Sequence, residues 1–81
     1  MGFLTALRDA MNPHARITLL VPDNVDADSI EQQARQIMKR WRVVTWGWQV
    51  VANTVIFRVY EPDRFTARGR LEEAGVEFKK P

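Results

Sequence analysis

The fold is decided by residues 43–60, which read VVTWGWQVVANTVIFRVY. Apolar and polar side chains alternate on both sides of Ala52-Asn53, a pattern that predicts a β-hairpin with strands 43–51 and 54–60. Strict alternation places one set of side chains on a core face: Trp46, Trp48, Val50, Val55, Phe57 and Val59. The opposite face then carries Thr45, Gly47, Gln49, Ile56, Arg58 and Tyr60 and is mixed in character.

A helix is predicted just before this hairpin. Asp26 is a good N-cap, and Ile30, Ala34 and Met38 begin an apolar stripe at helical spacing that ends near Trp41. Before the helix, residues 15–21 alternate as a first strand and end at Pro22-Asp23-Asn24.

A second helix is predicted after the hairpin. Pro62-Asp63 opens it, Ala67 and Leu71 face inward, and Gly75 is the expected stop. Residues 76–78 then alternate as a short final strand. At the other end of the chain, residues 1–12 have the spacing of a short amphipathic helix that ends at Asn12-Pro13.

The predicted order is therefore one helix followed by β-α-β-β-α-β. This is the ferredoxin-like α+β pattern, with an antiparallel sheet in the order 4-1-3-2 and two helices on one face. We expect a single domain over residues 1–81, made of the N-terminal helix at 1–12 and a βαββαβ core at 15–79. Many unrelated functions use this architecture, so the pattern alone predicts none of them.

Composition limits the classes of function. The chain has 81 residues, no cysteine, one histidine and a formal net charge of +2. Disulfides are excluded, and a single histidine is a poor start for a zinc site. The sequence has no apolar run of the roughly 20 residues that a membrane-spanning helix needs. We expect a cytoplasmic protein without a cofactor.

Catalysis has little support in the sequence. Ser29 is the only serine, in the predicted first turn of a helix, and His14 has no evident acid or nucleophile beside it. Asp23, Asp26, Asp28 and Glu31 match no calcium loop, and acids at a helix start have an ordinary structural explanation. We therefore expect neither an enzyme nor a metal site.

The leading hypothesis is a protein-interaction module. In the 4-1-3-2 order, strand 43–51 lies at the rim without a charge or a proline to block pairing with another chain. The N-terminal helix could instead cover this edge, and a different strand order would bury it. An inhibitor, an adaptor or a homodimer subunit fits this hypothesis, with an interface at Val43, Thr45, Gly47, Gln49, Val51, Ile56 and Tyr60.

The alternative hypothesis is a nucleic-acid-binding domain. An RNA-binding sheet stacks bases on two or three aromatic rings, but strict alternation leaves Tyr60 as the single ring on the open face. This alternative depends on a patch of basic residues around that ring: Arg16, Arg35, Lys39, Arg40, Arg42, Arg58 and Tyr60. A small-ligand sensor with a pocket between two copies is a third, more distant hypothesis.

Overall fold

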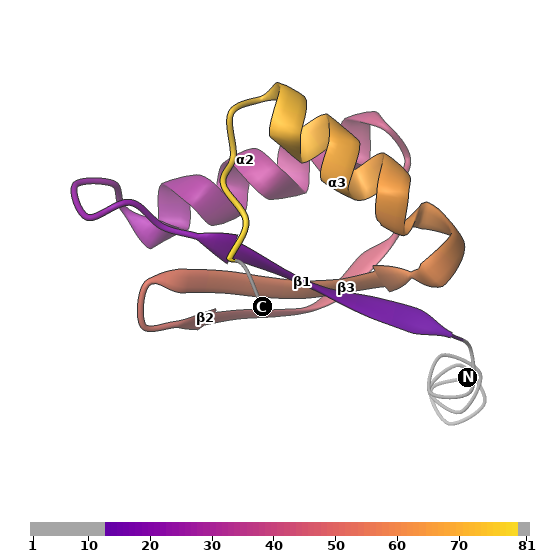
Figure 1. Cartoon of the computed structure of the whole chain (residues 1–81), viewed down its shortest axis with the longest axis horizontal. Helices are drawn as coiled ribbons and strands as arrows, with labels where there is room; N and C mark the ends of the chain where they lie inside the picture. The colour runs from indigo at the N-terminus through magenta and orange to yellow at the C-terminus, as the bar shows by residue number, and fades with distance from the viewer. Residues whose placement is uncertain (1–12, 80–81) are drawn as a thin grey trace.

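The computed structural model describes residues 13–79 (Figure 1). Its elements follow one another as β1 His14–Leu20, α2 Ala27–Arg40, β2 Thr45–Val51, β3 Thr54–Tyr60, the 3-10 turn η1 Glu61–Asp63, and α3 Arg64–Glu73. The helix predicted at residues 1–12 lies outside the described residues. The hairpin prediction is confirmed, since β2 and β3 pair antiparallel around residues 52–53.

The sheet corrects the predicted fold class. Within residues 13–79 it has three strands in the order β1-β3-β2, all antiparallel neighbours, so the four-stranded ferredoxin-like βαββαβ prediction is wrong. The segment expected as a fourth strand makes only one isolated bridge, between Leu19 and Phe78. The physical reason lies at Val76, whose N–H bonds to the Leu71 carbonyl at 3.0 Å and completes the end of α3 instead of a ladder.

Helix α2 forms where the sequence predicts it. Asp26 is the N-cap, and its carboxylate accepts a bond from the Asp28 N–H at 3.4 Å, which satisfies one of the free donors of the first turn. Ile30, Ala34 and Met38 are its buried residues. The apolar stripe therefore faces the sheet.

Both α-helices lie on the same side of the sheet (Figure 1). The core between the layers includes Ile17 and Leu19 from β1, Phe57 and Val59 from β3, and Leu71 from α3, each almost fully buried. The alternate residues of β1 and β3 point to the other side of the sheet. We call that side the open face.

Candidate functional site

A glycine bulge in β2 determines which side chains reach the open face. Trp46 pairs with Arg58 and Gln49 pairs with Ile56, so Gly47 and Trp48 together stand opposite Phe57 alone. Gly47 has a φ of 67°, the left-handed conformation that glycine adopts without a Cβ penalty. The arrangement is a β-bulge, and it adds one residue to the two-residue period of the strand.

The bulge separates the two tryptophans of β2. Trp48 stays on the helix side, where its ring stacks on Phe57 with centroids 4.2 Å apart. Trp46 shares a face with its partner Arg58, on the open side of the sheet. The prediction that both tryptophans belong to the core face is therefore wrong for Trp46, because strict alternation does not hold through the bulge.

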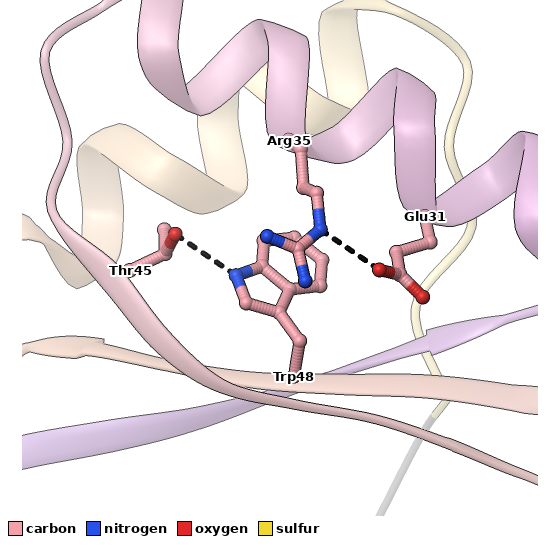
Figure 2. Close-up of polar contacts among 4 residues, drawn as sticks. All are labelled: Glu31, Arg35, Thr45 and Trp48. Atoms are coloured by element: carbon pink, nitrogen blue, oxygen red, sulfur yellow. Dashed lines mark hydrogen bonds and ion pairs between the residues drawn. The ribbon is translucent and has the colours of Figure 1, made fainter.

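Trp48 is held in place by polar contacts from two elements (Figure 2). Its Nε1–H donates to Thr45 Oγ1 at 3.0 Å. The Arg35 guanidinium lies 4.6 Å from the centre of the indole, and Arg35 Nε donates to Glu31 Oε2 at 2.8 Å. These contacts give Trp48 and Arg35 a structural role at the junction of α2 and β2.

Three aromatic rings meet on the open face. The Trp46 and Tyr60 centroids are 4.7 Å apart, and the His14 ring meets Trp46 edge-on with centroids 6.0 Å apart. The three residues come from three different strands, at the end of the sheet where β1 begins. We call Trp46, Tyr60 and His14 the aromatic cluster.

Two arginines lie next to the aromatic cluster. Arg16 and Arg58 are direct partners in the β1–β3 ladder. They lie next to the His14–Tyr60 pair on the open face. A Cβ placed on Gly47 would be 3.6 Å from Arg58 Cδ, so the Arg58 side chain lies beside the bulge. The glycine is therefore required by its backbone conformation and not by a lack of space beside Arg58.

The predicted basic patch divides between the two sides of the molecule. Arg16, Arg58 and Tyr60 share the open face. The remaining members belong to α2 and the turn that follows it, on the covered side of the sheet: Arg35, Lys39, Arg40 and Arg42. The structure therefore does not bring these seven residues together.

The predicted interface residues divide in a similar way. Val43 precedes β2 and is buried, and its N–H bonds to the Met38 carbonyl at 2.8 Å. Thr45 pairs with buried Val59 and points to the helix side. The bulge itself holds Gly47, and the open face holds Gln49, Val51, Ile56 and Tyr60. The same bulge that moves Trp46 outward places Thr45 inward.

Two functional candidates were missed by the sequence analysis. Strict alternation assigns Trp46 to the core, and His14 is considered only as a catalytic residue. The signal for the first was Gly47, because a glycine inside a strand often marks a bulge.

The acids near the start of α2 have structural partners, as Asp26 and Glu31 show, and residues 13–79 contain no group of His, Asp and Glu that could hold a metal ion.

Comparisons of this chain with protein-family models, with curated proteins and with solved structures gave no match. Within residues 13–79, no helix is long and apolar enough to cross a membrane.

Proposed function

We propose that this protein binds single-stranded nucleic acid on the open face of its sheet. The observation that carries the proposal is the contact of Trp46 with Tyr60 at 4.7 Å, beside the Arg16–Arg58 pair. Aromatic rings on an open sheet stack on exposed bases, and arginines next to them contact the phosphates. Such a protein acts by binding, without a chemical step.

The shape of the site favours a single strand over a duplex. The bases of a duplex are stacked on one another, so rings on a sheet can reach only bases that are unpaired and splayed. The aromatic cluster presents its rings on the face of the sheet, whereas the major groove of a duplex is read by an inserted α-helix or β-ribbon. Recognition of this kind tolerates many sequences, because every base has a π-face.

The test compares two tryptophan variants in a binding titration. Trp46→Ala removes the central ring of the aromatic cluster and should weaken binding of a labelled, mixed-sequence oligonucleotide by roughly 5- to 100-fold, as expected for a lost stacking contact. Trp46→Phe keeps a ring and should retain most of the affinity. Trp41→Ala is the matched control, because Trp41 contacts Arg70 of α3 and lies outside the open face.

The measurement is fluorescence anisotropy at low salt, with circular dichroism to confirm that each variant is folded. An affinity unchanged by Trp46→Ala would refute the proposal. So would the absence of binding by the wild-type protein.

A second proposal concerns the outer edge of β2. Among residues 13–79 no strand pairs on that side, and Val50 and Val51 are 45% and 51% exposed. An uncharged edge can pair antiparallel with the same edge of a second copy without charge repulsion. The bulge weakens this proposal, because it leaves only the end of β2, residues 48–51, for regular pairing.

Gln49→Lys tests the edge by placing a charge in that regular segment. If the β2 edges of two copies pair, the wild-type protein should have the mass of a dimer by light scattering at about 10 µM, a concentration suited to micromolar self-affinity. The Gln49→Lys variant should have the mass of a monomer. The dimer should persist in high salt, since strand pairing does not depend on phosphate contacts. A monomeric wild type would exclude self-pairing at this concentration and leave a strand from another protein as the partner.

A further inference from the structure

An open hollow continues the candidate site beyond the two arginines. It has a volume of about 610 Å³, and its lining includes Arg16 and Thr18 of β1, Ile56 of β3, Arg68 of α3, and Lys79. Arg16 belongs both to this hollow and to the pair beside the aromatic cluster. The hollow and the aromatic cluster are therefore parts of one continuous surface.

The charge of the hollow is one-sided. Of the described residues that line it, three are cations and none is a carboxylate. Three arginines outside the hollow pair with acids: Arg35 with Glu31, Arg64 with Glu61, and Arg70 with Glu73. Within residues 13–79, Arg16, Arg68 and Lys79 form no such ion pair. Three cations gathered without a carboxylate favour an anionic ligand.

Two of these cations are brought to β1 by backbone and ring contacts. The Lys79 N–H donates to the Thr18 carbonyl at 3.0 Å, and the Leu20 N–H donates to the Glu77 carbonyl at 2.9 Å. These bonds attach the C-terminal segment to the free side of β1. The Arg68 guanidinium lies 4.6 Å from the Phe78 ring centre, which holds it beside the same segment.

From this arrangement we infer that the hollow is a phosphate subsite for the strand whose bases stack on the aromatic cluster. The inference depends on the proposed function and specifies the ligand: a single strand that runs along β1, contacts Arg16 midway and reaches Arg68 and Lys79. At about 3.3 Å per residue, Thr18 lies about 13 Å along β1 from His14. A base-stacked strand rises about 3.4 Å per nucleotide, so at most about four nucleotides span both parts, and fewer where bases are splayed onto the rings.

The test uses a length series of oligonucleotides, from two to eight nucleotides, in RNA and DNA forms. Affinity for the wild-type protein should rise steeply between two and about four to six nucleotides. The double variant Arg68→Gln/Lys79→Gln should bind the dinucleotide as the wild type does, but should lose about tenfold in affinity for the hexanucleotide. The slope of log Kobs against log salt should fall by about 1.4, because two phosphate contacts with a single strand are lost.

Arg64→Gln is the matched control, since it removes a cation of α3 that pairs with Glu61 and does not line the hollow. It should leave the length series unchanged. If the double variant loses the same affinity for RNA as for DNA, the contact of Arg68 and Lys79 is with the phosphate. A loss confined to RNA would assign it to the 2′-hydroxyl and overturn the inference.

The two proposals fail in different ways. If Trp46→Ala weakens binding while the double variant binds the hexanucleotide normally, the hollow is not a phosphate subsite and the proposed function stands. If the wild-type protein binds no oligonucleotide in the series, both proposals are refuted.

Discussion

Trp46 lies against Tyr60 although the two residues are not partners in the sheet. Trp46 pairs with Arg58, Tyr60 pairs with His14, and the two rings meet diagonally with centroids 4.7 Å apart. Diagonal neighbours across a sheet are within reach of aromatic side chains. Both side chains are partly buried by their neighbours, which limits their rotamers before any ligand arrives. A site ordered in advance loses less conformational entropy on binding.

Replacement of Gly47 by alanine should destabilise the protein. Gly47 has a φ of 67°, and a Cβ there would make only ordinary contacts with Arg58, so the cost comes from the backbone. We expect Gly47→Ala to lower the free energy of unfolding by about 1–2 kcal/mol, measured by urea denaturation. Gly69→Ala, inside α3 with open space around it, should instead raise that free energy by about 0.5–1 kcal/mol.

Ala52 offers the reverse substitution. It is the first residue of the β2–β3 turn and has a φ of 52°, which a residue with a Cβ adopts at a cost. Ala52→Gly should therefore raise the midpoint of thermal unfolding, through a gain of about 1 kcal/mol in the free energy of unfolding. A lower midpoint would show that the flexibility that glycine adds to the unfolded chain outweighs the relief of strain.

The aromatic core should be sensitive to truncation at Phe57. This ring is fully buried and stacks on Trp48, so Phe57→Ala should cost about 3–5 kcal/mol of unfolding free energy. A loss of this size is a large part of the stability of a small domain. Phe65→Ala removes the same atoms from a side chain that is 75% exposed and should change the free energy by less than about 0.5 kcal/mol. Chemical denaturation followed by circular dichroism compares the two.

The salt dependence of binding should identify which arginines contact the ligand. If the strand crosses the open face, Arg16→Gln should reduce the slope of log Kobs against log salt by about 0.7, the value for one phosphate of a single strand. Arg40→Gln changes an exposed residue at the end of α2 and should leave the slope unchanged. A slope that falls in Arg40→Gln and stays unchanged in Arg16→Gln would place the ligand on the helix side of the sheet. Titrations at several salt concentrations measure both slopes.

Much of the fold follows from short-range rules. The Asp26 cap, the buried stripe of α2 and the turn at residues 52–53 could all be predicted because neighbouring residues in the sequence determine them. The fourth strand could not, because it depends on whether Val76 extends a ladder or completes the end of α3. Alternating residues alone do not distinguish these outcomes.

The candidate site was less predictable than the fold. Its central ring depends on the backbone of Gly47, and the sequence allows that glycine to be a bulge or a regular strand position. An assignment of faces by alternation is correct for β3, which is regular, and fails for β2 before the bulge. Lys79 reaches the hollow through the bonds that attach the C-terminal segment to Thr18 and Leu20, and alternation does not predict these bonds.

The bulge in β2 also has a genetic consequence. When one residue is added to a strand with a two-residue period, the side chains on one side of the insertion change faces while every other amino acid stays the same. A single inserted codon is therefore enough to transfer an indole such as that of Trp46 from the interior of a sheet to its surface. A face that binds can arise in this way without the substitution of any amino acid already present.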